Sequence, residues 1–274
     1  MPAIKDWLID ASTQLSVAEI LSARLDVEII LAYTLNKDRT YLHAHPEQIL
    51  DDKQLNDADR YLTQRLNRVP IAYITGCKEF YGRNFTVTPA TLIPRPESED
   101  IITILKSILL STNYYLPSTN LIDVGTGSGC LGITAKLEFP NLNVTLTDIS
   151  TEALEIASQN AKNLASDVKI IQNNLLKNYS GQPDIIIANL PYVDKSWTRS
   201  PETNNEPALA LFADNGGEAL IEELIIQANK LLPDNGYLII EADPDQQTDL
   251  INYAKKHSFT MIQQINYILA FKHQ

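Results

Sequence analysis

The stretch LIDVGTGSGCLGI, residues 121–133, gives the clearest indication of the fold. A short apolar run leads into three glycines at every second position, Gly125, Gly127 and Gly129, and another apolar run follows them. Glycines in such a turn let the backbone bend tightly and approach a bound group closely. The stretch therefore predicts a buried strand, a glycine-rich turn and the first turns of a helix, in that order.

The chain that follows repeats this alternation of strands and helices. We expect strands at VTLTDI (144–149), VKIIQ (168–172), DIIIAN (184–189) and YLIIEA (237–242), and helices at TEALEIASQNAKNL (151–164) and EALIEELIIQANKLL (218–232). This order implies an α/β fold with a mostly parallel sheet that is covered by helices on both faces. The tail FTMIQQINYILAFKH (259–273) contains two strand-like runs with no helix between them, so we expect an antiparallel pair at one edge.

The residues before this region form two further segments. Residues 1–70 carry apolar side chains at helical spacing, as in VEIILAYTL (27–35), and predict a small helical domain. Residues 71–95 contain aromatic residues, β-branched residues and two glycines, which predicts a hairpin that links the domains. A proline-rich turn and a helix then open the α/β domain, which we place at 96–274.

Two carboxylates flank the glycine turn. Asp123 lies two residues before Gly125, and Asp148 ends the next predicted strand. An acid at the second position is the usual partner of a ribose diol in doubly wound folds, including NAD sites. NAD sites, however, carry G-x-G-x-x-G on a loop that cradles a pyrophosphate, whereas D-x-G-x-G-x-G suits a ligand with a cationic amino acid, such as S-adenosylmethionine. The pattern favours a methyltransferase over a dinucleotide enzyme, which stays the alternative.

The stretch DIIIANLPYV, residues 184–193, contains the residues that we expect to hold the substrate for the reaction. Asn189 follows a buried strand, at the edge where open α/β sheets bind ligands. Its side-chain oxygen and the carbonyl of Leu190 are two acceptors that can grip one NH₂ group, and Pro191 holds residue 190 extended. Tyr192 offers a face for a planar substrate. An amide nitrogen held by two acceptors at about 3–3.5 Å from a sulfonium methyl needs no strong base. The purely structural alternative is a polar strand end before a proline turn.

Composition narrows the class of protein. The 274 residues, 44% of them hydrophobic, are ample for a buried core, and the net charge of −12 argues against a nucleic-acid binder, which usually presents a basic patch. The two cysteines, Cys77 and Cys130, show neither a disulfide framework nor a zinc-ligand spacing, so we expect no metal. The charged first helix is not typical of a signal peptide, and the apolar runs are too short to span a bilayer. We expect a cytoplasmic protein without a membrane partner.

Several segments together carry a resemblance to a known family. They are RVPIAYITGCKEFYGRNFTVTPATLIPRPESE (68–99), IDVGTGSG, TDISTEALEIASQNAKN, ANLPYV, EPALALFADNGG (206–217) and IIEADPDQ. They span nearly the whole chain, and LIPRPESE is the most diagnostic of them. The sequence resembles the release-factor glutamine methyltransferases, which methylate the glutamine side chain of the Gly-Gly-Gln motif in peptide chain release factors.

The resemblance implies a fold, a reaction and a set of site residues. The fold is a class I S-adenosylmethionine-dependent methyltransferase, Rossmann-like, preceded by a small helical domain that docks the release factor. The reaction is methylation of the glutamine side-chain nitrogen, N5. The implied cofactor residues are Gly125, Thr126, Gly127, Ser128, Gly129, Asp148, Asn174, Leu175 and Asn189, with Asn174 and Leu175 beside the adenine. The implied catalytic residues, which grip the amide, are Asn189, Leu190, Pro191 and Tyr192.

The sequence departs from the family pattern at two places. Leu190 stands where the family usually has the first proline of Asn-Pro-Pro-Tyr, and Asn174-Leu175 stands where an acid and an aromatic residue are usual. Asn-Leu-Pro-Tyr also occurs in rRNA adenine dimethyltransferases, so an rRNA adenine N6-methyltransferase is the alternative enzyme. The long segment before the glycine turn and the acidic charge argue against it. A catalytically inactive binding module is a third reading, against which the intact Asp148, Asn189 and Tyr192 count.

Overall fold

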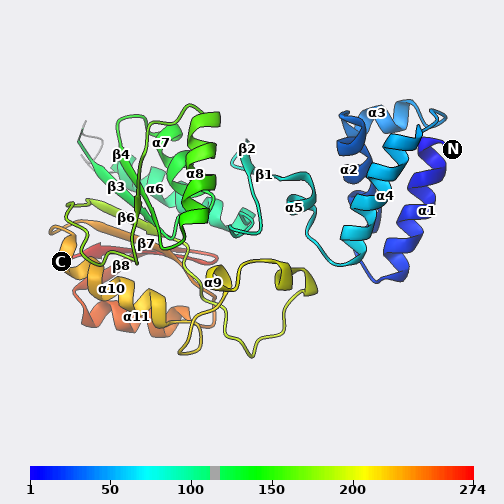
Figure 1. Cartoon of the computed structure of the whole chain (residues 1–274). Coiled ribbons are helices and arrows are strands. Elements are labelled where there is room, and N and C mark those ends of the chain that lie inside the picture. The colour runs from blue at the N-terminus through cyan, green and yellow to red at the C-terminus, as the bar shows by residue number, and fades with distance from the viewer. Residues whose placement is uncertain (112–117) are drawn as a thin grey trace. The chain divides into compact units, whose positions relative to one another are not determined.

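The computed structural model describes residues 1–111 and 118–274. Its chain divides into two compact units, of which the first comprises Met1–Cys77 and Ser200–Asn205 and the second comprises Lys78–Arg199 and Glu206–Gln274. Figure 1 shows the helices and strands of each unit. Among the described residues, none of the helices combines the length and the apolar character that a membrane span requires.

The first unit is helical, as the sequence predicts. It consists of α1 (Ile4–Val17), α2 (Ala23–Leu35), α3 (Arg39–Ala44), α4 (Asp52–Leu66), α5 (Ile71–Thr75) and the short 3₁₀ helix η2 (Pro201–Asn205). The apolar faces of α1, α2 and α4 enclose a core that includes Ile4, Leu15, Ile30 and Leu62. This unit therefore has a hydrophobic core of its own.

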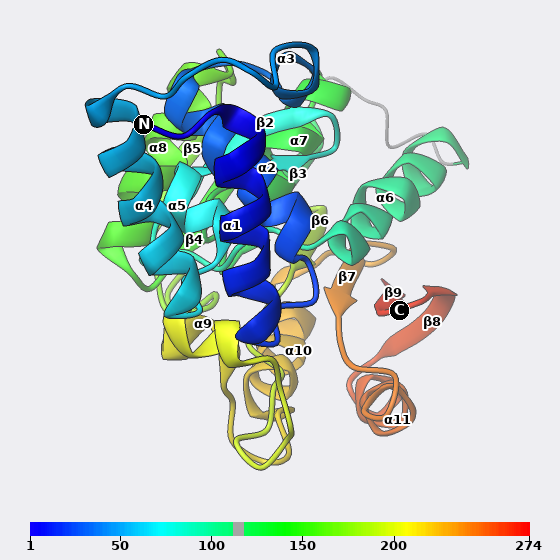
Figure 2. The same ribbon diagram turned by 90° about the vertical axis from the view of Figure 1, so that its right-hand side faces the viewer.

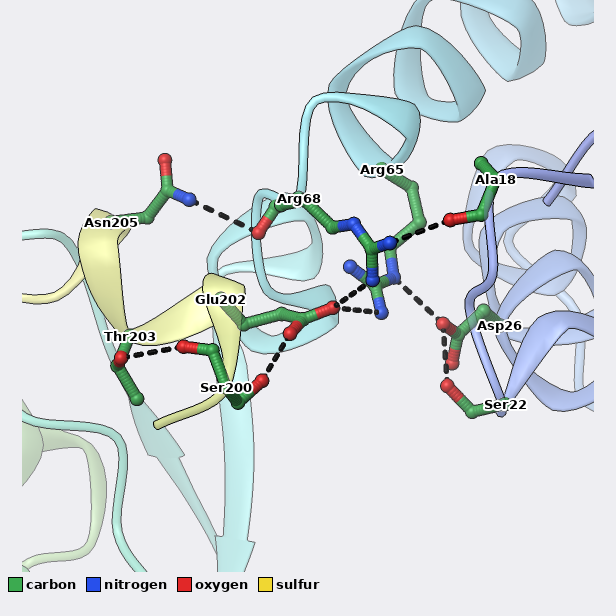
Figure 3. A network of polar contacts seen from close by, with 9 residues as sticks. All are labelled: Ala18, Ser22, Asp26, Arg65, Arg68, Ser200, Glu202, Thr203 and Asn205. Atoms are coloured by element: carbon green, nitrogen blue, oxygen red, sulfur yellow. Dashed lines mark hydrogen bonds and ion pairs between the residues drawn. The ribbon is translucent and has the colours of Figure 1, made fainter. Parts of the chain in front are cut away.

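A polar network attaches the distant segment Ser200–Asn205 to this helical unit (Figure 3). The Glu202 carboxylate accepts hydrogen bonds from Arg65 Nη2 at 3.0 Å and Arg68 Nη1 at 3.3 Å. The buried Arg65 also donates from Nε to Asp26 Oδ2 at 2.7 Å, so its charge is balanced from two sides. The chain thus leaves the second unit after residue 199, contributes six residues to the first unit, and returns at residue 206.

The segment predicted as a hairpin begins with a helix. Residues 71–75 form α5, which starts after Pro70 and ends at Gly76 with φ of 70°. The hairpin itself is confined to β1 (Cys77–Phe80) and β2 (Arg83–Thr86). A short apolar run such as IAYIT has no periodicity that separates helix from strand, which is why its β-branched residues misled the prediction. The 3₁₀ helix η1 (Pro96–Ser98) then leads into α6 (Glu99–Ser111), with a proline at the start as expected.

The second unit is built on a seven-stranded sheet with the order β5-β4-β3-β6-β7-β9-β8. The strands are β3 (Asn120–Val124), β4 (Asn143–Asp148), β5 (Lys169–Gln172), β6 (Ile185–Ala188), β7 (Tyr237–Glu241), β8 (Phe259–Ile265) and β9 (Ile268–His273). The pairs among β3 to β7 are parallel, whereas β9 runs antiparallel to both β7 and β8. The predicted fold class is confirmed, and the reversed strand is the one next to the edge.

Helices cover both faces of the sheet (Figure 1, Figure 2). Alternate residues of a strand point to opposite faces, so Leu121 and Ile187 join one hydrophobic cluster and Ile122 and Ile186 join the other. The first cluster is completed by α6, α7 (Cys130–Glu138) and α8 (Thr151–Asn163), and the second by α10 (Ala219–Leu231) and α11 (Gln247–Lys256). The short helix α9 (Ala208–Leu211) follows the chain's excursion through the helical unit.

The strand register brings the predicted site residues to one edge of the sheet. Val124 of β3 is level with Thr147 of β4 and with Ala188 of β6, and Ala188 is level with Ile240 of β7. The residues that follow, Gly125, Asp148, Asn189 and Glu241, therefore lie along the carboxyl edge, where ligands bind in open α/β sheets.

Candidate active site

A cavity of about 320 Å³ opens at this carboxyl edge, a volume typical of small-molecule sites. Ten of the residues predicted from the sequence line it: Gly125, Thr126, Gly127, Ser128, Asp148, Asn174, Leu175, Asn189, Leu190 and Pro191. Two others, Gly129 and Tyr192, are not among the lining residues. The structure therefore gathers the predicted cofactor residues and the predicted amide-gripping residues in one hollow.

The glycine turn presents an open surface to the cavity at Gly127. This residue has φ of 55°, a conformation that side-chain-bearing residues rarely adopt, and no atom lies within 4 Å of the position that a Cβ would occupy. Its backbone N–H donates to Asp148 Oδ2 at 2.9 Å, while Gly125 and Thr126 donate to the Thr147 carbonyl. The turn is thus fixed to the neighbouring strand and leaves room for a ligand against its backbone.

Asp123 braces the glycine turn from inside the protein. Its Oδ2 accepts hydrogen bonds from Thr126 Oγ1 at 2.6 Å and from the Gly132 N–H at 2.9 Å. The side chain is fully buried, and this burial raises the pKa of Asp123 to about 6. The sequence suggested a carboxylate that favours a cationic ligand, but the structure places this carboxylate beneath the turn, outside the lining of the cavity.

Asp148 lines the cavity with both oxygens already oriented. Oδ1 accepts from the Ser150 N–H and Oδ2 accepts from the Gly127 N–H, each at 2.9 Å. Burial raises the pKa of Asp148, and these backbone hydrogen bonds oppose that rise. Because each carboxylate oxygen can accept more than one hydrogen bond, the group retains capacity for two hydroxyls of a ligand.

Asn160 ties the hairpin to the glycine turn, a role that the sequence did not reveal. This buried side chain of α8 donates from Nδ2 to the carbonyls of Thr86 at 2.9 Å and Ser128 at 2.8 Å. Its Oδ1 accepts from the Thr86 N–H at 2.8 Å, so all of these contacts fix its amide orientation. The available signal was an amide on the otherwise apolar buried face of the helix at 151–164.

A chain of hydrogen bonds supports Asn189. Its Nδ2 donates to Ser98 Oγ at 2.9 Å, and Ser98 Oγ donates to Glu241 Oε2 at 2.5 Å. The Tyr192 hydroxyl donates to the other oxygen, Glu241 Oε1, at 3.0 Å. Burial raises the pKa of Glu241, while the hydrogen bonds from Ser98 and Tyr192 oppose the rise. Sequence reasoning missed Ser98 and Glu241, although an acid that ends the apolar strand YLIIE was a visible signal.

Residues of the segments EPALALFADNGG (206–217) and IIEADPDQ (239–246) hold the backbone that follows Asn189. Gln246 donates from Nε2 to the carbonyls of Tyr192 at 2.8 Å and Gly216 at 2.7 Å. Gly217 has φ of 93°, and a Cβ at this position would collide with the Tyr192 carbonyl. Glu206 accepts hydrogen bonds from the Ile93 N–H and from Arg95 Nη2. The segment 206–217 therefore both lines the cavity, through Pro207, Leu209 and Ala210, and holds its neighbouring backbone in place.

Comparison with known proteins identifies the family. Residues 6–76 match the PrmC N-terminal domain, and residues 98–205 match the methyltransferase small domain. The release factor glutamine methyltransferase of Koribacter versatilis is 36% identical over 251 residues, which cover 88% of this chain and 88% of that protein. The protein of the same name from Salmonella typhimurium is 36% identical over 86% of this chain and 84% of its own length. The chain belongs to the release factor glutamine methyltransferase family.

Other similar proteins differ in length or share the fold alone. A bifunctional methyltransferase of Rickettsia bellii is 32% identical over 94% of this chain, which spans about half, 52%, of that protein. A solved Pyrococcus furiosus methyltransferase aligns with a TM-score of 0.52 and 18% identity over 78% of this chain and 98% of its own. A solved Thermus thermophilus 16S rRNA methyltransferase also aligns with a TM-score of 0.52, with 14% identity over 72% of this chain and 50% of its own. Membership of the family confirms the expected enzyme class, an S-adenosylmethionine-dependent methyltransferase.

The two departures from the family pattern both line the cavity. Leu175 and Leu190 are 8% and 4% exposed and belong to one hydrophobic cluster, together with Val124. Leu190 Cδ2 lies 2.8 Å from the position that a Cβ on Gly125 would occupy, so the side chain covers the glycine turn. Leu190 therefore places an aliphatic side chain against the turn, and Leu175 adds a second aliphatic side chain to the lining.

Proposed function

We propose that this enzyme transfers a methyl group from S-adenosylmethionine to the side-chain amide nitrogen, N5, of the glutamine in the Gly-Gly-Gln motif of peptide chain release factors. The observation that carries the proposal is a single cavity that joins the open glycine turn, the Asp148 carboxylate and the Asn189 amide. The proposed substrate is supported by two relatives that are named release factor glutamine methyltransferase and that align with this chain over 88% and 84% of their own length.

The residues of the cavity suit the proposed cofactor. The open backbone at Gly127 leaves room for the amino-acid part of the ligand, and Asp148 retains acceptor capacity for the ribose hydroxyls. Leu175 supplies an apolar surface for the adenine, with Asn174 beside it. When bound, S-adenosylmethionine supplies an electrophilic methyl group on a cationic sulfur.

The turn Asn189–Tyr192 suits a primary amide. Ser98 engages Nδ2 of Asn189, and the remaining polar atom of that side chain is its oxygen, an acceptor. This oxygen and the carbonyl of Leu190 accept the two hydrogens of the glutamine NH₂ and so aim the nitrogen. Pro191 restricts Leu190 to an extended conformation, which directs that carbonyl. Tyr192 anchors the end of the turn through Glu241.

The helical unit is proposed to dock the release factor. It has its own core and matches an N-terminal domain that the family shares. The Ser200–Asn205 segment belongs to this unit and continues at Glu206 into a wall of the cavity, so docking acts on a unit covalently joined to the site. We therefore propose that the substrate is a protein. No direct contact with nucleic acid or with a membrane is expected, and the cytoplasmic location stays a prediction.

Transfer of radiolabel tests the proposed substrate. Labelled S-adenosylmethionine is offered with release factor, with release factor in which the glutamine of Gly-Gly-Gln is replaced by alanine, and with small-subunit rRNA. Label in the first sample alone is the expected result. Label in the rRNA would overturn the proposal in favour of the adenine methyltransferase, and label in the alanine variant would show that another residue is methylated.

A further inference from the structure

The hydrogen bonds around Glu241 have a fixed direction. When Glu241 is ionised, its carboxylate only accepts, and the Ser98 hydroxyl donates its single proton to Glu241 Oε2. Ser98 Oγ then has only lone pairs left, and it accepts from the neighbouring Asn189 amide, which therefore turns its Nδ2 toward Ser98. The relay thus determines which end of the Asn189 amide remains for the cavity.

This orientation is a chemical choice and not a steric one. The oxygen and nitrogen of an asparagine side chain have nearly the same size, so packing alone does not distinguish the two orientations. In the reverse orientation Asn189 would present NH₂ to the glutamine NH₂, and two donors would face each other. Only a partner with a fixed role, such as a hydroxyl whose proton is already committed, selects one orientation.

We propose that Glu241 and Ser98 are positioning residues that orient the Asn189 amide so that its oxygen accepts from the substrate. The inference rests on the proposed function of Asn189. The same carboxylate holds the Tyr192 hydroxyl, so one buried group anchors both ends of the Asn-Leu-Pro-Tyr turn. Ser98 and Glu241 are 143 residues apart in the sequence and are 2% and 1% exposed. A buried carboxylate is costly without such partners, and here the Ser98 and Tyr192 hydroxyls and the Asn189 amide all favour its ionised form.

The first test separates positioning from a general structural role. Ser98→Ala removes the hydroxyl, and we expect single-turnover methylation of release factor at saturating cofactor to fall at least about tenfold, with unchanged affinity for S-adenosylmethionine. Ser107→Ala is the matched control, because Ser107 lies on α6 and bonds to Ile104 and Gln263 at an exposed position. The control should keep the full rate.

The Asn189→Ala background supplies the decisive comparison. If Ser98 acts through Asn189, adding Ser98→Ala to Asn189→Ala lowers the remaining rate by less than about twofold. An equal fold-loss in both backgrounds would mean that Ser98 acts by another route, and the inference would be overturned. An Asn189→Ala variant that methylates at the full rate would overturn the proposed role of Asn189, and with it the inference. A parent enzyme that leaves the glutamine of release factor unlabelled would instead overturn the proposed function, so the two failures are distinguishable.

A polarity swap tests the relay without relying on the residual rate. In Asn189→Asp, two carboxylates compete for the single Ser98 proton, and in Glu241→Gln the introduced amide can donate to Ser98 and release the orientation of Asn189. The double variant restores a complete relay, because the introduced amide donates to Ser98 and Ser98 donates to the introduced carboxylate. We expect each single variant to be slowed at least about tenfold and the double variant to be at least about fivefold faster than either. A double variant no faster than the better single variant would refute the relay, and cofactor binding reports folding in each case.

Discussion

Replacing Leu190 with proline restores the motif that the family usually carries, and the structure allows both of its consequences to be estimated. The Leu190 side chain is 4% exposed and packs over Gly125. Truncating such a leucine to alanine costs about 2–5 kcal/mol, but the proline ring keeps most of the carbon atoms, so a cost of about 1–2 kcal/mol is expected. Proline also restricts the unfolded chain, which offsets about 0.4–1 kcal/mol where the backbone is compatible. The variant should therefore lose about 1 kcal/mol of stability.

The effect of Leu190→Pro on the reaction should be small, because the proposed contact is the backbone carbonyl of residue 190. We expect the rate of glutamine methylation to stay within roughly tenfold, which is less than about 1.4 kcal/mol in the barrier. Asn189→Ala removes one of the two acceptors that aim the nitrogen, and it should cost on the order of a hundredfold or more. Both variants should still bind S-adenosylmethionine measurably.

Single-turnover rates on purified release factor and urea unfolding measure the two effects separately. The stability loss should appear in the unfolding midpoint of Leu190→Pro, with an unchanged denaturant slope. A large loss of rate in Leu190→Pro beside a mild loss in Asn189→Ala would refute the reasoning, because the turn would then not grip an amide as proposed.

Three further predictions concern other parts of the molecule. Asp148→Ala should weaken S-adenosylmethionine by about 1.5–3 kcal/mol in calorimetry, and unchanged affinity in a folded variant would exclude Asp148 as the ribose acceptor. Gly217→Ala should lower the thermal midpoint, because φ of 93° and the nearby Tyr192 carbonyl leave no room for a Cβ; a variant as stable as the parent would contradict this close approach. Burial acts against ionisation of Glu202, but hydrogen bonds from Ser200, Arg65 and Arg68 hold its pKa at about 2, against 4.5 ordinarily. A carboxylate whose pKa is lowered by folding stabilises the folded protein at pH values above its ordinary pKa. This contribution to the free energy of unfolding should therefore be lost as pH falls from about 4.5 to about 2. Glu202→Gln should remove that part of the pH dependence of stability, which unfolding measured at each pH would show.

The fold and the edge that carries the site follow from local patterns in the sequence. LIDVGTGSG and DIIIANLPY each contain an apolar strand and the turn after it, so the identity of the residue at the strand's carboxyl end is visible directly. Parallel pairing then brings Gly125, Asp148 and Asn189 to one edge, without any knowledge of side-chain contacts. The short helix at 71–75 was missed because five residues are too few to show a period.

The partners across long sequence separations did not follow from such patterns. Arg65 and Glu202 are 137 residues apart, and no local signal assigns Ser200–Asn205 to the helical unit. Their pairing follows from tertiary packing, because the buried Arg65 guanidinium requires carboxylates on more than one side.

The residues that support the site share a signal that can be used on other sequences. Asp123, Asn160 and Glu241 are buried polar residues in otherwise apolar strands or helix faces. Most buried polar side chains in proteins are hydrogen-bonded, and at the carboxyl edge of a parallel sheet the ligand-binding turns are close enough to supply the partners. Asp123 and Asn160 bond to the glycine turn, and Glu241 bonds to Ser98 and Tyr192 around Asn189. A polar residue that interrupts an apolar run near a strand's carboxyl end therefore predicts a residue that holds the site in place, even where the sequence does not show its partner.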